Sequence, residues 1–157
     1  MTAPRTVETV DELKSLVGQE LGVGPWFEIT QDRINAFADV TEDHQYIHVD
    51  PERAAKTPFG TTIAHGFLTL SLIPALGRGR GGVQVKLNSK MAVNYGLNRV
   101  RFISPVKVGS RVRMRTTLQA VDEVSPGVLQ LTQTQTIEIE GGERPAVVAE
   151  SLTRLYL

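Results

Sequence analysis

The 157-residue sequence has no cysteine, few aromatic residues and no net charge. The lack of cysteine excludes disulfide bonds, thiolate metal sites and cysteine nucleophiles. Lysine plus arginine equals aspartate plus glutamate at 17 each, so the charge does not favour nucleic acid or an acidic membrane surface as a partner. The least charged region includes an apolar run, 63–76, that is too short to span a bilayer, and the N-terminus lacks an apolar signal core. We therefore expect a cytoplasmic protein with no nucleic-acid or membrane partner.

The composition suits one compact globular domain. Hydrophobic residues make up 41% of the chain and charged residues 22%, which disfavours disordered and fibrous classes. A chain of this length buries a substantial core without disulfides or metals. No internal repeat, low-complexity tract or linker divides it, so a single domain over residues 1–157 is expected.

The first half of the sequence has helical patterns. A short helix is expected over 10–17, then a break at two glycines and a proline, and a short strand over 26–29. Thr30 is a good N-cap for a second helix that should fade near Val40. Nearly every position from 63 to 76 is apolar or small, which predicts a long central helix buried on most sides.

The second half has strand patterns. A short alternating run over 100–104 ends at Pro105, and three long strands are expected over 111–124, 127–140 and 146–157. The residues between the long strands are few and rich in glycine and proline, as in hairpin turns. The sequence thus predicts an α+β fold in which an antiparallel sheet follows one long buried helix.

The stretch DHQYIHVDPERA, residues 43–54, concentrates polar side chains, and all three histidines of the chain lie between His44 and His65. Asp43 and His48 are five residues apart and converge only if the segment curls as an irregular loop. A carboxylate and an imidazole placed together can hold one water, accept its proton and return a proton to the product. This pair is therefore a candidate catalytic dyad.

Plainer interpretations stay open at this point. Asp43 could cap a turn, and His48 could be a buried imidazole bonded to a backbone carbonyl. A metal site is a weaker alternative, because no two candidate ligands have the i, i+4 spacing of a helical zinc site. The candidate ligands are Asp43, His44, His48, Asp50 and His65.

A second motif, AHGFLTLSL, places His65 and Gly66 at the start of the expected buried helix. The first backbone N–H groups of a helix have no intrahelical partner, and glycine has no side chain to keep a carbonyl oxygen away from its N–H. Such an N–H can stabilise the oxyanion that develops on a thioester. Alternatively, Gly66 only permits close packing of the helix against the sheet.

Taken together, these two motifs resemble the MaoC-like, or (R)-specific enoyl-CoA hydratase, branch of the hot-dog fold. In that family a segment G-D-x-N-P-[LIV]-H precedes a helix that begins HG[ML], and this chain has TEDHQYIHVDPERAA followed by AHGFLTLSL. Gln45 and Tyr46 match the nodulation-protein-N-like branch, which has Q-[WY]-I-H. The stretch YGLNRVRFISPVKVGSRV also resembles the family's entry into its long strands.

The resemblance implies a sheet wrapped around a long central helix and an enzyme that adds water to trans-2-enoyl-CoA, or runs the reverse dehydration. Asp43 and His48 would be catalytic, with Asp43 as principal base, although the reverse division stays open. Substrate-binding roles fall to Gly66, Gln45, Tyr46, His65 and Asn94. The resemblance also implies an acyl-CoA substrate, a homodimer with an acyl tunnel at its interface, no metal and no cofactor beyond the CoA of the substrate.

Three departures from the family pattern stand out. Glu42 replaces a frequent glycine, Gln45-Tyr46 replaces Asn-Pro, and Pro74 stands where some members have a serine that contacts the water. Alternative functions are a hot-dog acyl-CoA thioesterase, a non-catalytic acyl-binding module and a dehydratase for acyl groups on a carrier protein. The sequence does not distinguish CoA from a carrier protein and does not reveal the chain length of the acyl group.

Overall fold

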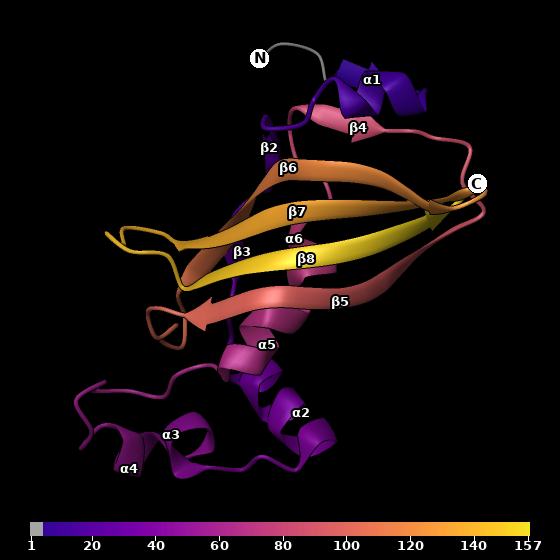
Figure 1. Ribbon diagram of the computed structural model, residues 1–157. Coiled ribbons are helices and arrows are strands. Elements are labelled where there is room, and N and C mark those ends of the chain that lie inside the picture. The colour runs from indigo at the N-terminus through magenta and orange to yellow at the C-terminus, as the bar shows by residue number, and fades with distance from the viewer. Residues whose placement is uncertain (1–4) are drawn as a thin grey trace.

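The computed structural model describes residues 5–157 and consists of a curved antiparallel sheet and short helices (Figure 1). The helices are α1 (Val10–Lys14), α2 (Gln31–Thr41), α3 (Tyr46–Val49), α4 (Pro51–Ala54), α5 (Gly66–Ser71) and α6 (Ile73–Leu76). The strands are β1 (Arg5–Val7), β2 (Glu20–Val23), β3 (Phe27–Glu28), β4 (Val83–Val85), β5 (Met91–Phe102), β6 (Arg111–Ser125), β7 (Val128–Ile139) and β8 (Val147–Tyr156). In Figure 1, α2 to α5 lie beyond the β5 edge of the sheet, α6 lies behind the sheet, and α1 lies at the opposite side beside β4. Residues 1–4 of the expected 1–157 domain lie outside this description.

The sheet has the order β2-β6-β7-β8-β5, and β3 also pairs with β6. Its pairs are all antiparallel, while β1 and β4 form a separate parallel pair. The three long C-terminal strands and their short connections are therefore confirmed. Buried and more exposed residues alternate along β6, β7 and β8, because successive side chains of a strand point to opposite faces.

The sequence-based prediction missed β1, β2 and β4 and shortened β5. The strand expected over 100–104 is the end of β5, which begins at Met91 and pairs with β8 along its length. Gly22 and Gly24 were expected only to break the chain, but Gly22 lies within β2. A Cβ at Gly22 would lie 1.8 Å from the carbonyl oxygen of Gly81, so this glycine permits a close backbone approach inside a strand.

The long central helix is wrong as predicted. It begins at Gly66 rather than residue 63 and divides into α5 and α6, with Leu72 at the junction. Pro74 explains the division, because proline has no N–H to donate to the carbonyl of Leu70 and its ring crowds that carbonyl. Most residues of α5 and α6 are buried or half-buried, but Phe67, Ser71 and Pro74 leave one side exposed.

The core consists of two hydrophobic clusters. One lies between α2, α5 and α6 and the sheet, and includes Ile34, Leu68 and Ile137. The other lies under α1 and β2 at the opposite end of the long strands, and includes Leu13, Leu118 and Leu131. Among residues 5–157, no helix is long and apolar enough to cross a membrane.

Candidate active site

The segment 43–54 is not the irregular loop expected from the sequence, because most of it forms the short helices α3 and α4. α2 ends at Glu42, which has a left-handed backbone conformation with φ of 59°. This sharp turn sends the chain back beneath α2 and past the start of α5. Asp43 therefore follows the turn directly, and His48 lies within α3.

His48 is a buried side chain with a fixed orientation. It is 7% exposed, and its Nδ1 lies 2.7 Å from the backbone oxygen of Ile63. Because a carbonyl oxygen only accepts hydrogen bonds, Nδ1 carries the proton and Nε2 is left as the acceptor nitrogen of the neutral ring. The structure thus gives His48 the tautomer that a general base requires.

His65 packs directly against His48. The two rings are stacked with centroids 3.8 Å apart and planes 22° apart, and the Phe37 ring lies 4.9 Å from His65 on centroids. His65 Nε2 donates to the backbone oxygen of Asp43 at 2.9 Å. Its Nδ1 is buried and has no hydrogen-bond partner among the described residues. His65 therefore connects the segment that carries Asp43 to the ring of His48.

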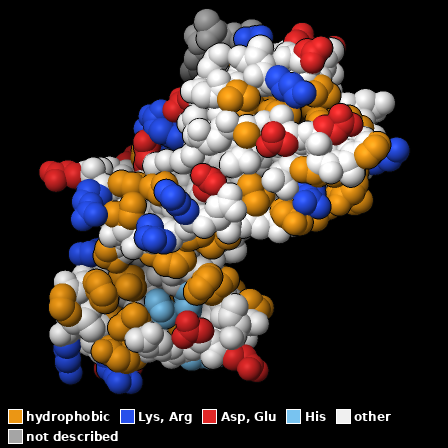
Figure 2. All heavy atoms as spheres, viewed as in Figure 1, with side chains coloured by type: hydrophobic (Ala, Val, Ile, Leu, Met, Phe, Trp, Pro, Cys, Tyr) orange, Lys and Arg blue, Asp and Glu red, His pale blue; other side chains and the backbone are white. Residues whose placement is uncertain are grey.

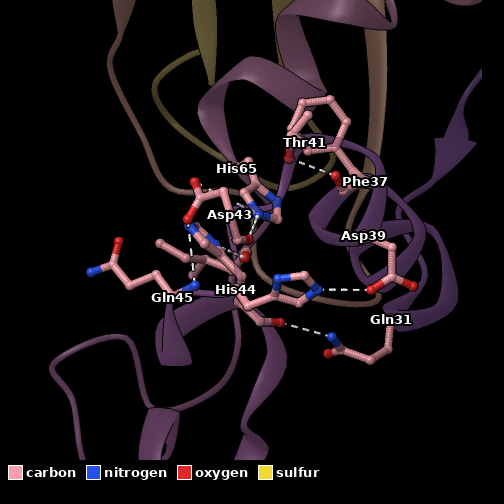
Figure 3. A network of polar contacts seen from close by, with 10 residues as sticks. Gln31, Phe37, Asp39, Thr41, Asp43, His44, Gln45 and His65 are labelled. Carbon is pink, nitrogen blue, oxygen red and sulfur yellow. Dashed lines mark hydrogen bonds and ion pairs between the residues drawn. The ribbon is translucent and has the colours of Figure 1, made fainter.

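The Asp43 carboxylate lies beside His65 (Figure 3). Its side chain is 55% exposed, and Oδ2 lies 4.0 Å from His65 Nε2. One ligand-type atom from each of Asp43, His48 and His65 lies within 4.8 Å of the others. The structure thus brings the two proposed catalytic side chains together, with His65 as a third member.

The histidine arrangement does not suit a metal ion. A ligating imidazole nitrogen directs its lone pair in the ring plane, and two nearly parallel rings stacked 3.8 Å apart direct theirs along separate lines. His65 Nε2 is also already engaged as a donor to Asp43 O. One ion cannot lie in both ring planes without reorienting a ring.

A pocket of about 250 Å³ opens beside His48. Gly66, at the first position of α5, lines it, and no side chain caps that helix start. The Gly66 N–H has no partner within the helix. A Cβ on Gly66 would lie 2.9 Å from the Phe102 ring, so both expected roles of this glycine, an available N–H and close packing, fit the geometry.

Burial lowers the pKa of His48, and the charge of protonated His65 acts in the same direction. The hydrogen bond to the Ile63 carbonyl and the negative charge of Asp43 oppose this shift without reversing it. A lowered pKa keeps the imidazole neutral at neutral pH. His48 is therefore able to accept a proton there.

Asp43 does not itself line this pocket, and the remaining sequence-predicted residues also lie outside it. Gln45 is exposed, and its backbone oxygen accepts from the His48 N–H at 2.9 Å. Tyr46 lies under the guanidinium of Arg53 at 4.1 Å. His44 is exposed and bonds to Asp39 at 2.8 Å, as expected for a surface position (Figure 3). Asn94 is on β5 and lines two other cavities.

Sequence reasoning missed most residues that line the pocket, among them Thr69, Phe102 and Ser104. Thr69 follows Gly66 by one helical turn, a spacing that was available from the sequence. Phe102 and Ser104 come from the end of β5 and the segment after it, so only the tertiary structure brings them to His48. In the space-filling view, histidine side chains reach the surface in a hollow between hydrophobic patches and next to an acidic side chain (Figure 2).

Comparison with known proteins agrees with this geometry. The family model described as the MaoC like domain matches residues 12–139. 3-Hydroxyacyl-thioester dehydratase Z of Mycobacterium tuberculosis (strain ATCC 25618 / H37Rv) is 52% identical over 150 residues, which is 96% of this chain and 97% of that protein. Nodulation protein N of Rhizobium leguminosarum bv. viciae is 50% identical over 143 residues, 90% of this chain and 88% of that protein.

A solved structure shows the same architecture. The (R)-hydratase from A. caviae involved in PHA biosynthesis superposes with a TM-score of 0.69 and 31% identity, and covers 87% of this chain and 94% of that chain. The α+β hot-dog fold and the resemblance read from the two motifs are therefore confirmed. The chain belongs to the MaoC-like dehydratase family, a family of hydro-lyases.

Proposed function

We propose that this protein adds water across the double bond of trans-2-enoyl thioesters of CoA to give (R)-3-hydroxyacyl thioesters, and catalyses the reverse dehydration. The observation that carries the proposal is the pairing of His48 with Gly66 on one pocket. His48 offers an unprotonated ring nitrogen, and Gly66 offers a backbone N–H that no side chain caps. A base and an oxyanion donor facing one cavity are what hydration of a thioester requires.

In the proposed reaction, the thioester carbonyl accepts a hydrogen bond from the Gly66 N–H. A water held between Asp43 and His48 attacks C3 as one of its protons passes to the dyad. The electrons of the double bond move to the carbonyl oxygen and form an enolate, which the Gly66 N–H stabilises. The dyad then returns the proton to C2. These steps use only side chains, backbone and water, so no cofactor is invoked.

The geometry favours His48 as the proton acceptor and Asp43 as the group that orients the water and stabilises the imidazolium. Burial and the fixed tautomer prepare His48, whereas Asp43 is half exposed. This reverses the division of roles expected from the resemblance.

An assay with crotonyl-CoA tests the proposal. Loss of the enoyl absorbance without release of free thiol indicates hydration, whereas free thiol indicates a thioesterase. We expect Asp43→Asn and His48→Gln each to lower turnover by about two orders of magnitude or more. His44→Gln is the matched control, since it changes a neighbouring exposed histidine outside the pocket. Wild-type turnover in both dyad variants would exclude the mechanism, and crotonyl carrier protein assayed in parallel distinguishes the two thioester carriers.

We further propose a homodimer that forms along β5. This strand ends the sheet, and within residues 5–157 its outer edge pairs with no other strand. Its exposed apolar side chains include Met91, Val93, Tyr95 and Leu97, between 42% and 56% exposed. A long apolar edge strand favours pairing with another strand, and a second β5 would cover it.

Light scattering tests this arrangement. We expect the wild type to have the mass of two chains and Leu97→Glu to shift the equilibrium toward one chain, because a carboxylate would be buried at the new interface. Val124→Glu is a matched control, since Val124 is 42% exposed at the far end of β6. A monomeric wild type would remove the proposed interface.

A further inference from the structure

A row of polar side chains crosses the buried face of the sheet and separates the two hydrophobic clusters. Along β6, Thr116 stands between Met114 of one cluster and Leu118 of the other. The same sequence of apolar, polar and apolar residues occurs along β7 and β8. The members of this polar row are Thr116, Gln133, Gln135, Ser151 and Thr153.

Three members of the polar row are buried, and the amide nitrogen of one of them is held only by long hydrogen bonds. Thr116, Gln135 and Ser151 are 1%, 4% and 8% exposed. Thr116 donates to Gln135 Oε1 at 2.8 Å, but Gln135 Nε2 reaches Gln133 and Ser151 only at 3.3 Å. Buried polar groups disfavour folding unless they are well bonded, so apolar side chains would serve the core better here. The row therefore calls for an explanation other than stability.

The polar row forms the floor of a cavity of about 580 Å³, which we call the distal chamber. Its other wall is the segment after α6, which contributes Arg78, Arg80 and Lys86. No aspartate or glutamate lines the chamber, and none of these three cations forms an ion pair within the described part of the chain. Burial lowers the pKa of Arg80, which reflects a guanidinium partly removed from water. The distal chamber is thus polar, cationic and without a compensating charge.

An apolar cavity of about 370 Å³ adjoins the distal chamber on the side of α5 and β5. The two share Ile73, Pro74, Asn94 and Ser151, and the apolar cavity is further lined by Leu70, Tyr95, Leu97 and Leu152. The same two elements border the His48 pocket, through Gly66 and Phe102. The His48 pocket and the apolar cavity share no lining residue, and a chain that runs between α5 and β5 from one to the other passes the apolar residues of that cavity before it meets the polar row.

The spacing along β8 gives the length of such a chain. Val147 lines the His48 pocket and Ser151 lines the distal chamber, four residues further along the strand. At about 3.3 Å per residue this is roughly 13 Å, which an extended chain spans in about eleven bonds. An acyl group of about twelve carbons would thus place its end among the cations.

We propose that the distal chamber binds a carboxylate at the far end of the acyl chain, so that monothioesters of medium-chain dicarboxylic acids are preferred substrates. This inference rests on the proposed hydration of enoyl thioesters and names the substrate class of that site. A terminal methyl group would remove water from the polar row and replace none of its hydrogen bonds. A terminal carboxylate accepts charge-assisted hydrogen bonds from Arg80 and amide donors from the row.

A binding comparison tests the chamber apart from turnover. Dodecanoyl-CoA and the monothioester of dodecanedioic acid with CoA have the same chain length and no double bond, so neither is hydrated. We expect the carboxylate-ended compound to bind the full-length protein at least about tenfold more tightly in calorimetry, within the range of a charge-assisted hydrogen bond. Equal or weaker binding overturns the inference, while hydration of crotonyl-CoA decides the proposed function separately.

Two charge-removing variants locate the effect. Arg80→Gln should reduce the ratio of the two dissociation constants at least about tenfold, whereas Lys14→Gln, an exposed lysine on α1, should keep the wild-type ratio. An unchanged ratio in Arg80→Gln would show that the carboxylate is bound elsewhere and overturn the assignment. If Arg80→Gln folds poorly, the wild-type ratio at about 0.05 M and 1 M salt serves instead, since screening must shrink a preference that rests on cations and a salt-independent ratio contradicts it.

Discussion

Replacing His65 with phenylalanine separates the role of this histidine in catalysis from its role in packing. Phenylalanine keeps a planar ring between Phe37 and His48, where the present centroid distances are 4.9 and 3.8 Å. It removes the donor to Asp43 O, at a cost of about 1–3 kcal/mol if that oxygen is left unpaired. It also removes the buried Nδ1 that has no hydrogen-bond partner. Removing this unpaired group stabilises the folded state by a similar amount. The two effects oppose each other, so the free energy of unfolding should change by less than about 1 kcal/mol.

Turnover should respond differently. Without the hydrogen bond from His65, the backbone at Asp43 is no longer held against the histidine pair, and we expect kcat to fall about tenfold or more, within the range of positioning effects. Since the charge of His65 contributes to lowering the pKa of His48, the acid limb of the pH–rate profile should move to higher pH. His65→Ala, which leaves a cavity, should instead lose about 2–4 kcal/mol of stability.

Urea unfolding together with a pH profile of crotonyl-CoA hydration checks this reasoning. A loss of 3 kcal/mol or more in His65→Phe would mean that Nδ1 is well bonded in solution, in contradiction to the opposing effects invoked above. Wild-type kcat with an unmoved acid limb would show that His65 does not position Asp43. A structural role alone lowers stability without moving the acid limb.

Three further predictions concern the same region. Glu42→Gly should raise the free energy of unfolding by up to about 1 kcal/mol in urea titrations, because the left-handed backbone at φ 59° disfavours glutamate more than it disfavours glycine, and a loss of stability would contradict this. The folded-state pKa of His48 lies below its ordinary 6.5, so the unfolded chain takes up the proton first and stability should decline as pH falls from about 6.5 through that lowered pKa. His48→Gln should abolish this part of the pH dependence, and an identical slope in both proteins would refute the assignment. In Gly66→Ala the new Cβ meets the Phe102 ring at 2.9 Å, so a double-mutant cycle with Phe102→Ala should give a coupling of about 1 kcal/mol in unfolding, and additive effects would rule out the contact.

The strands, and the proximity of Asp43 to His48, could be predicted from sequence for different reasons. Alternation along β6, β7 and β8 is a local pattern that reports directly on one buried face. Asp43 and His48 were found because two separate motifs match a family, although the turn at Glu42 and the stacking of His65 on His48 are tertiary features with no local signal. His65 was expected to bind substrate; in the structure it is 3% exposed and does not line the His48 pocket.

The prediction of one long central helix was wrong because an unbroken apolar run was taken to mean an unbroken helix. The run 63–76 is apolar throughout, but apolar composition reports burial and does not require one uninterrupted set of helical hydrogen bonds. Pro74 argued against one continuous helix, since a proline in a helix interior destabilises the helix by about 3 kcal/mol or more. β5 was underestimated for the opposite reason: its residues are exposed, so a search for buried alternation did not find the strand at the edge of the sheet.

The position of Pro74 also changes the meaning of one departure from the family pattern. Some members have a serine there that contacts the reacting water, which suggested a lost contact near the dyad. In this chain Pro74 lines the apolar cavity and the distal chamber and does not line the His48 pocket. By ending α5, it also begins the short α6 that leads into the segment with Arg78 and Arg80. A substitution at this position therefore acts on the shape of the distal cavities, where the end of an acyl chain would lie, rather than on Asp43 and His48.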